Sequence, residues 1–335
     1  MEYKENKPDL TAAEISSLWA AYQNETVAIC GISYFLVHIN DESIRQILEK
    51  ALMISKRRKE KLVQLFTAEN YPVPLGFTEQ DVNLNAPRLF SDRLYLEYIL
   101  QMTNLDMAQY SSAFTNASRS DIIDLYSNIL HEVKQLHIES KQLMKEKGWY
   151  ISQPTIPKPN DIHFVEKESF LEGWLGDRRP LLGIEIAQLI FNSKRNALGQ
   201  ALITGFSQVA KLKEVRRFCE RGRDISGKHV EVFSAVLHDD YVSDATMVLT
   251  SEVTDSTEAP FSDKLIMVLI TTLISSGVSE YGMSMSMSPR RDISIHYTRL
   301  AAELVQYLSD GADMIINHGW MEQPPIAANR KDLAK

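Results

Sequence analysis

Apolar residues recur along the chain with the spacing of one helix face. Ile15, Leu18, Trp19 and Tyr22 stand at positions i, i+3, i+4 and i+7, which places them along one side of a helix. The same period continues in three later segments, whose apolar positions are Ile44, Ile47, Leu48, Ala51, Ile54, Leu62, Leu65 and Phe66; Leu94, Tyr98, Met102 and Leu105; and Ile122, Tyr126, Ile129, Val133, Leu136 and Leu143. The pattern predicts four long amphipathic helices in the first half of the chain.

The sequence also matches itself when it is shifted by 171 positions, which places Trp149 on Trp320. The aligned pairs include Gly148/Gly319, Phe90-Ser91-Asp92/Phe261-Ser262-Asp263, Glu14-Ile15/Glu185-Ile186, Tyr110/Tyr281, Tyr126/Tyr297, Arg119/Arg290, Asp121/Asp292 and Glu132/Glu303. One offset that serves both ends of so long a unit indicates an internal duplication. We therefore predict an all-α chain that consists of two tandem four-helix bundles.

The connections within one copy are of unequal length. Asn40-Asp41 and the region of Ser118 mark short joints, whereas residues 71–87 form a long connection between the second and third predicted helices. Two helical hairpins joined by a long crossover form the ferritin-like arrangement, which we favour over an up-down bundle with a loose loop. The predicted domains are residues 1–155 and 180–335.

The linker between these domains, residues 156–179, carries apolar side chains that a free tether would not need. They are Ile162, Phe164, Val165, Phe170, Leu171, Trp174 and Leu175. We therefore expect the linker to pack against the bundles.

Helix ends carry capping signals at equivalent places in the two copies. Ser91 or Asp92 can cap the third helix, with Phe90 as a hydrophobic staple. Gly148 follows the fourth helix, where a left-handed residue is favoured.

Composition narrows the function classes. Hydrophobic residues make up 44% and charged residues 24%, and a formal net charge of -8 argues against a general nucleic-acid or anionic-membrane surface. No apolar run reaches about 18 residues, so no membrane span is predicted. Cys30 and Cys219 are expected to be reduced core residues, and the charged N-terminal residues do not form a signal peptide. Both features favour a cytoplasmic location.

A ferritin-like bundle invites the hypothesis of a di-iron or di-manganese centre, which needs a Glu-x-x-His pair on two of its helices. No glutamate is followed at the third position by histidine. None of the eight histidines is matched by a histidine in the other copy; His229, for example, falls on Arg58. Carboxylates alone could hold a metal, but Glu14 stands in a predicted first turn. We therefore expect no metal, no cofactor and no catalytic residue. The glutamates to test for a metal are Glu14, Glu60, Glu132, Glu185, Glu231 and Glu303.

Two further patterns have alternative interpretations. The pairs Arg178-Arg179 and Arg290-Arg291 could hold a phosphate at a helix start, but we favour arginines that bridge the two domains through carboxylates. Met283, Met285 and Met287 could form a partner surface, but we favour core filling.

Long strings of the sequence carry a resemblance that covers nearly the whole chain. They are Leu10-Thr11-Ala12-Ala13-Glu14-Ile15, Pro74-Leu75-Gly76-Phe77, Ala86-Pro87-Arg88-Leu89-Phe90-Ser91-Asp92, Gly176-Asp177-Arg178-Arg179-Pro180, Gly205-Phe206-Ser207-Gln208-Val209-Ala210-Lys211 and Gly319-Trp320-Met321-Glu322-Gln323-Pro324-Pro325. In these strings the chain resembles the domain-of-unknown-function 3231 family of endospore-forming bacteria.

The resemblance implies two tandem ferritin-like bundles and, through some members, a distant similarity to spore coat protein F. It supplies no activity and no catalytic residue. We therefore expect a structural or interaction protein that associates with itself or with protein partners, with a spore-coat association implied by the resemblance alone. The alternative is a ferritin-like protein that binds a metal or a small ligand, with oxidoreductase activity.

Overall fold

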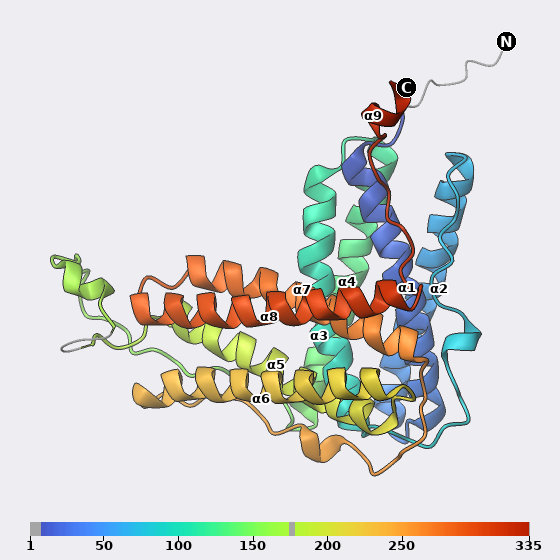
Figure 1. Ribbon diagram of the computed structural model, residues 1–335. Helices are drawn as coiled ribbons and strands as arrows, with labels where there is room; N and C mark the ends of the chain where they lie inside the picture. The colour runs from blue at the N-terminus through green and yellow to red at the C-terminus, as the bar shows by residue number, and fades with distance from the viewer. Residues whose placement is uncertain (1–7, 174–177, 335) are drawn as a thin grey trace. The chain divides into compact units, whose positions relative to one another are not determined.

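The computed structural model describes residues 8–173 and 178–334, and its helices are shown in Figure 1. The helices are α1 (Ala12–His38), α2 (Glu42–Ala68), α3 (Asp92–Asn116), α4 (Ser120–Glu146), α5 (Gly183–Val209), α6 (Lys213–Asp239), α7 (Asp263–Ser286), α8 (Arg291–Asn317) and the short α9 (Arg330–Leu333). Within these described residues no strand forms, although Phe90 and Val253 make one isolated β-bridge. The prediction of an all-α chain is confirmed.

The helix boundaries repeat along the chain as the sequence does. The first helix of each half begins at Ala12 and at Gly183, and the last begins at Ser120 and at Arg291. Both pairs of starting points are separated by the offset of the sequence repeat, so the tandem duplication is present in the structure as well as in the sequence. In the residues that the structure describes, each half contains four long helices.

The predicted capping devices are present. The Ser91 hydroxyl accepts a hydrogen bond from the Leu94 backbone N–H at 3.2 Å, and Ser262 accepts one from Leu265 at 3.1 Å. Gly148 and Gly319 both follow the last helix of their half with φ of 68° and 66°. Because a left-handed residue ends a helix with little strain only when it lacks a Cβ, these glycines are the natural stops.

Contacts divide the described chain into two compact units. The first contains residues 1–84, 98–143 and 319–335, and the second contains residues 85–97 and 144–318. The tail after α8 thus groups with the first unit, and the tail after α4 groups with the second. The domain boundaries at residues 155 and 180 stay a prediction.

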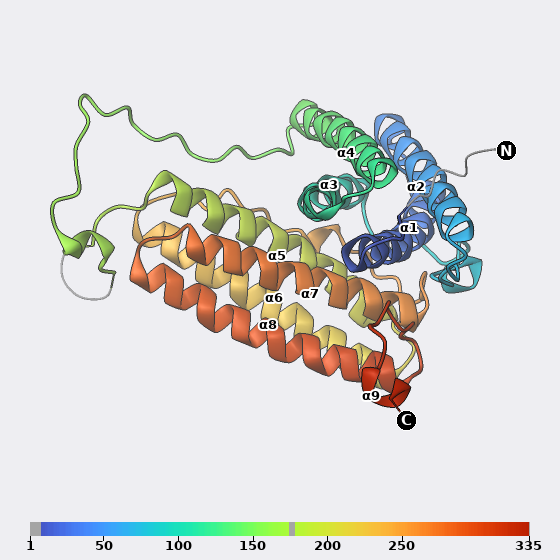
Figure 2. The same ribbon diagram turned by 90° about the horizontal axis from the view of Figure 1, so that it is seen from above.

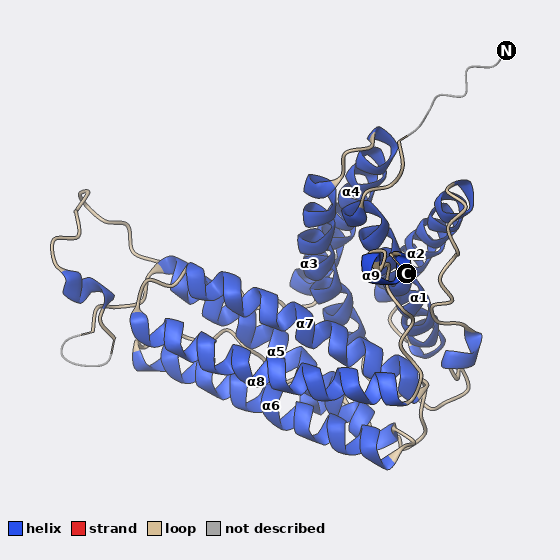
Figure 3. Cartoon of the chain, turned by 45° about the horizontal axis from the view of Figure 1, so that its top comes forward, coloured by secondary structure: helices blue, strands red, loops and turns tan. Residues whose placement is uncertain are grey.

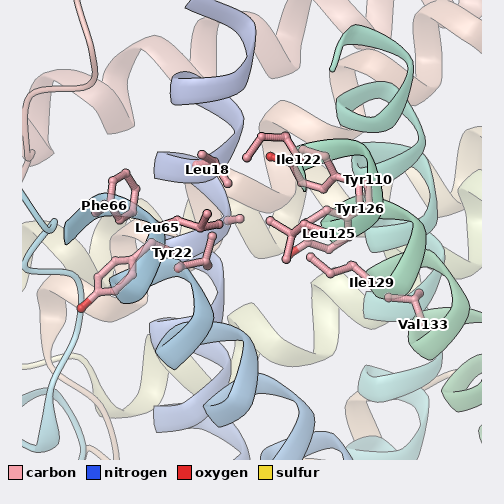
Figure 4. Close-up of a cluster of buried hydrophobic side chains, with 12 residues drawn as sticks. Leu18, Tyr22, Leu65, Phe66, Tyr110, Ile122, Leu125, Tyr126, Ile129 and Val133 are labelled. Carbon is pink, nitrogen blue, oxygen red and sulfur yellow. The ribbon is translucent and has the colours of Figure 1, made fainter. Parts of the chain in front are cut away.

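In the first unit, the apolar faces of α1 to α4 meet in a continuous core (Figure 4). Its buried residues are Leu18, Ala21, Tyr22, Leu62, Leu65, Phe66, Tyr110, Ile122, Leu125, Tyr126, Ile129 and Val133. Most of these positions belong to the apolar stripes predicted from the sequence. The core therefore forms where the helical periodicity places it.

In the second unit, α5 and α6 form one pair of neighbouring helices and α7 and α8 form another, and α5 also contacts α7 (Figures 2 and 3). The Phe233 ring packs on Tyr281 and Tyr297, with ring centroids 5.5 and 5.4 Å apart. Phe90 and Phe261, the two staple residues, both pack edge-on against Phe206. Packed aromatic rings thus form part of the core of this unit.

The expectation of a packed linker is wrong for its middle part. Ile162 and Phe164 are 90% and 89% exposed, because the proline-containing stretch that precedes them is extended and carries no helix to bring them to a core. The part nearer α5 does pack, since Arg179, whose guanidinium lies 4.4 Å from the centre of the Phe170 ring, binds Glu185 of α5 at 2.8 Å. Trp174 and Leu175 lie outside the described residues.

The α7 helix is long and apolar enough to cross a membrane by length and composition, with a mean hydropathy of 1.4 over its most apolar window. Half of that window is buried inside the protein. The core helix of a globular domain has the same properties, so α7 gives no clear indication of a membrane span.

The methionine run at the end of α7 does not fill the core, contrary to the interpretation that we favoured. Met283, Met285 and Met287 are 44%, 39% and 40% exposed. Alternate positions on a helix point to different sides, and the end of α7 offers no neighbour that could cover all three. These side chains therefore add apolar surface to the second unit.

Candidate functional site

A polar centre lies in the middle of the first half, where each of the four helices contributes a side chain. Arg58 of α2 is 7% exposed and donates hydrogen bonds to Glu25 of α1 at 3.2 Å and to Glu132 of α4 at 3.0 Å. Tyr110 of α3 donates its hydroxyl hydrogen to Glu25 at 3.1 Å, and Arg58 lies over its ring. A buried guanidinium therefore bridges the carboxylates of two different helices.

The charges of this centre shift the pKa values of its members. Burial alone would lower the pKa of Arg58, but Glu25, Tyr110, Asp106 and Glu132 reverse this effect and raise it above the usual value. Burial, together with the negative charge of Glu25, raises the pKa of the Asp106 carboxyl to about 7. Arg58 is thus a permanent cation, and its positive charge compensates the buried carboxylates around it.

The second half carries a centre at the equivalent positions, with different chemistry. His229 of α6 contacts the Tyr281 hydroxyl through Nδ1 at 2.8 Å and the Glu303 carboxylate through Nε2 at 3.1 Å. Asn196 of α5 donates to the same tyrosine hydroxyl at 2.8 Å. Burial lowers the pKa of His229, although the hydrogen bond that its ring donates to the Glu303 carboxylate acts in the other direction. This centre is a chain of hydrogen bonds built around a neutral imidazole.

The two centres differ by a matched pair of substitutions. His229 stands at the position of Arg58 and Asn196 at the position of Glu25, while the tyrosine and the glutamate of the fourth helix are the same in both halves. A charged pair in the first half has therefore been exchanged for a neutral pair. Because one change without the other would leave an uncompensated buried charge, the two positions depend on each other.

A second polar cluster closes one end of each half. In the first half, the Glu14 carboxylate accepts hydrogen bonds from the backbone N–H groups of Thr11, Ser118 and Arg119 at 2.8 to 2.9 Å. Burial alone would raise the pKa of Glu14, but these three backbone groups outweigh it and lower the pKa to about 2. Glu14 thus fastens the start of α1 to the turn between α3 and α4.

In the second half, Glu185 joins the start of α5 to the turn between α7 and α8, but with different partners. Pro289 replaces Ser118 and has no N–H to donate, so only the Arg290 N–H, at 3.0 Å, remains from that turn. The Arg179 guanidinium supplies the missing donors, with both of its terminal nitrogens 2.8 Å from the carboxylate. Arg179 therefore pairs with a carboxylate, as expected, but both residues belong to the second unit, so this pair does not bridge two domains.

Arg119 and Arg290 complete these end clusters and are almost fully buried. Arg119 binds Glu69 at 2.7 Å and Asp121 at 2.9 Å. Arg290 binds, at the same repeat positions, Asp240 at 2.8 Å and Asp292 at 2.9 Å. The repetition of the whole network shows that it is a structural device of the repeat unit.

The six glutamates that the sequence suggested as metal ligands lie in three different environments in the structure. Glu14 and Glu185 lie at helix starts with backbone and arginine partners, whereas Glu60 and Glu231 are exposed. Only Glu132 and Glu303 belong to the polar centres, where Arg58 and Lys228 bind them. Within residues 8–173 and 178–334, no group of three or more histidine, cysteine and acidic side chains has the geometry for a metal ion.

Sequence reasoning missed the most informative residues of the centres. Glu25, Arg58 and Asn196 were not singled out, although Arg58 interrupts the apolar stripe between Ile54 and Leu62. A charged residue in the middle of a buried helix face is a recognisable signal, because it must find a buried partner. The recurrence of Tyr110 as Tyr281 pointed to the same place.

Comparisons with known proteins identify relatives but no activity. A search of curated proteins found no match. One solved structure, described as that of a "putative spore coat protein" from Bacillus halodurans C-125, covers 45% of this chain and 98% of its own, with 20% identity and a TM-score of 0.41. That likeness is too weak to carry any argument about this chain.

The family model gives a much broader match. The model described as "Protein of unknown function (DUF3231)" matches residues 1–162 and again residues 169–333. These two matches meet between α4 and α5, where the helices begin to repeat. The chain therefore belongs to the DUF3231 family and carries two tandem copies of its domain.

Proposed function

We propose that this protein has a structural, self-associating role and that its two halves are ferritin-like four-helix bundles whose metal-binding centres have been replaced by internal hydrogen-bond networks. The observation that carries the proposal is the position of Arg58. Its guanidinium lies between Glu25 and Glu132, within 3.2 Å of both carboxylates. A cation of the protein itself thus takes the place between facing carboxylates that a metal has in a ferritin-like protein.

The exposed surface of α8 supports an interaction role. Ile295, Val305 and Ile316 are 53%, 52% and 56% exposed. At the equivalent positions of the first half stand Asp124, Lys134 and Lys145, which are ordinary solvent-facing residues. These side chains, and the exposed methionines at the end of α7, give the second half apolar surface, and at the three α8 positions the first half is charged.

The cellular setting of this role is also a proposal. The family resemblance implies an association with the spore coat, and the two buried, unpaired cysteines fit a cytoplasmic site of folding. A fluorescent fusion of the full chain, followed while an endospore-forming host bacterium sporulates, tests both the spore-coat association and the cytoplasmic site of folding. Fluorescence that stays diffuse and never concentrates on the developing spore would contradict a coat association.

The alternative function is the binding of a small polar ligand inside the second half. Glu280 is 9% exposed and Asn192 is fully buried, and each has a side-chain oxygen without a hydrogen-bond partner in the described protein. Burying an oxygen without a partner costs about 1–3 kcal/mol, which a ligand or a bound water would recover. The first half has no carboxylate at the position of Glu280, since Gln109 stands there.

Sedimentation velocity on the full, untagged chain over a wide concentration range tests the proposed function. We expect species larger than a single chain that grow with concentration. A single chain at every concentration, with a small molecule retained in its native mass spectrum, would contradict the proposal and favour the alternative.

A further inference from the structure

The tail that follows α8 contacts the first unit through the carboxylate of Glu322. Glu322 accepts hydrogen bonds from the backbone N–H of Leu75 at 2.6 Å and of Gly76 at 3.3 Å, and from the side-chain amide of Gln23. Consecutive backbone N–H groups beside a left-handed glycine form a concave site for an anion. We call these three donors, on Gln23, Leu75 and Gly76, the seat.

The seat is rigid because the connection that forms it is pressed onto α1. Gly76 has φ of +64°, and a Cβ at this position would lie 2.6 Å from the Thr26 hydroxyl oxygen. The next residue, Phe77, is buried and donates its N–H to the same oxygen at 3.1 Å. The N–H groups of the seat are therefore held in place by α1 and not by the tail.

The tail itself is mostly extended and exposed. Its residues from Met321 to α9 form no regular structure, and Met321 and Ile326 are 51% and 73% exposed. The hydrogen bonds to Glu322 come from residues that are 246 to 299 positions away in the chain. An exposed segment without regular structure can leave its seat without unfolding a helix.

The repeat equivalents of Gln23 and Glu322 are also in contact, with different chemistry, in the second unit. The Lys194 ammonium of α5 donates to the backbone oxygen of Ile151 at 2.6 Å, and it lies 5.2 Å from the Tyr150 ring centre. Lys194 is the repeat equivalent of Gln23, and Ile151 is the repeat equivalent of Glu322. In both cases the tail of one copy is bound by the first helix of the other copy.

A contact that already joins one copy of the repeat to another can join copies from different chains. We propose that the seat accepts Glu322 of a second copy of this chain in place of its own, so that exchange of the tail, residues 319–334, links chains together. This inference rests on the proposed self-association and names the contact that produces it. Exchange of an identical segment requires no surface beyond the one present within the single chain.

Cross-linking between two differently labelled full-length chains tests the exchange. One chain carries Met321→Cys and the other, labelled with heavy nitrogen, carries Leu75→Cys; both substitutions are at exposed side chains and leave Glu322 and the backbone donors intact. The natural cysteines are buried. The chains are refolded together and treated with a short bismaleimide. We expect a cross-linked dimer that contains one chain of each mass.

Three controls make the outcome decisive. Adding Glu322→Gln to the Met321→Cys chain should lower the yield of the mixed dimer about tenfold, because charge-assisted hydrogen bonds are lost. Adding Glu166→Gln, at an exposed linker position, should not change the yield. A single chain with both cysteines, at high dilution, should cross-link within itself.

The exchange is overturned if the doubly substituted chain cross-links internally while the mixture gives no mixed dimer. If the chain nevertheless sediments as larger species, the proposed function stands and only the exchange fails. If the chain never associates, both fail. Absence of the internal cross-link would overturn the seat itself.

Discussion

Arg58 and His229 occupy the same place in the two halves, and both bind the carboxylate of the fourth helix, Glu132 in the first half and Glu303 in the second. The guanidinium carries a fixed charge, whereas the imidazole is held neutral by burial. The partner on the first helix follows this difference, since Glu25 faces Arg58 and the uncharged Asn196 belongs to the centre of His229. After the duplication, equivalent positions thus carry a charged set of side chains in the first half and an uncharged imidazole and amide in the second.

The interdependence of this pair gives the first prediction. Arg58→His alone leaves Glu25 buried without its cation, which should lower the free energy of unfolding of the first half by about 3–5 kcal/mol. The double variant Glu25→Asn with Arg58→His copies the second half and should recover about 1–2 kcal/mol of that loss. Recovery is partial because Asp106, which has Gly277 at its repeat position, remains. Native-state hydrogen exchange of α1 to α4 measures both values.

Arg57→His is the matched control for that experiment. Arg57 also contacts Glu132, but its side chain is 56% exposed, so its loss should change the stability by less than about 1 kcal/mol. Equal effects of the substitutions at Arg57 and Arg58 would show that burial of the ion pair is unimportant.

Acid stability is predicted to depend on Glu14. The pKa of this carboxyl is about 2 in the folded protein, below its ordinary value of 4.5. Its contribution to stability is therefore complete above about pH 4.5 and is lost as the pH falls towards 2. We expect Glu14→Gln to lower the urea midpoint at pH 7 and to flatten its fall between pH 4.5 and 2.5. The exposed Glu60→Gln serves as control, and a parallel pH profile for the Glu14 variant would contradict the prediction.

Two glycines of α5 are predicted to respond in opposite directions to alanine. A Cβ on Gly205 would lie 2.5 Å from the Phe90 ring, which is fully buried and cannot move away. A Cβ on Gly199 would meet only the Ser226 hydroxyl, at 3.6 Å. Thermal denaturation should show a loss of about 1–3 kcal/mol for Gly205→Ala and a gain of about 0.5–1 kcal/mol for Gly199→Ala. Similar values for both would mean that Phe90 does not pack against α5 as described.

The left-handed glycines provide a related comparison. Gly76 and Gly148 have φ of 64° and 68°, so alanine costs about 1 kcal/mol at either position through backbone strain. At Gly148 the space around a Cβ is open, whereas at Gly76 the Thr26 side chain occupies it. Gly76→Ala should therefore destabilise the chain clearly more than Gly148→Ala, as read from urea midpoints. The reverse order would be inconsistent with a rigid seat.

The fold was predictable because its signals are local and repeated. The period of Ile15, Leu18 and Tyr22 marks a buried helix face, and the offset that joins Trp149 to Trp320 shows the duplication. The linker was not predictable in the same way. Apolar residues such as Ile162 and Phe164 indicate burial only on average, and their exposure depends on which surfaces the extended chain reaches.

The polar centres were only partly predictable. The sequence named Glu132 and Glu303 as recurring acids, but it could not show which cation binds each one. Arg58 meets Glu132 across a separation of 74 residues, and no spacing rule within one helix reaches that far. The structural roles of Glu14 and Glu185 were easier to predict, because a glutamate in the first turn of a helix commonly pairs with the residue that precedes the helix.

Metal content tests the central claim, that the centre of the first half is closed by the protein's own arginine. The full chain, purified without chelator or affinity tag, is measured by elemental mass spectrometry, alongside the Arg58→Met variant. We predict no iron or manganese in stoichiometric amount in the unaltered chain, and a lower free energy of unfolding for the variant. About two iron or manganese atoms per half, as in a di-metal carboxylate bundle, would contradict this account.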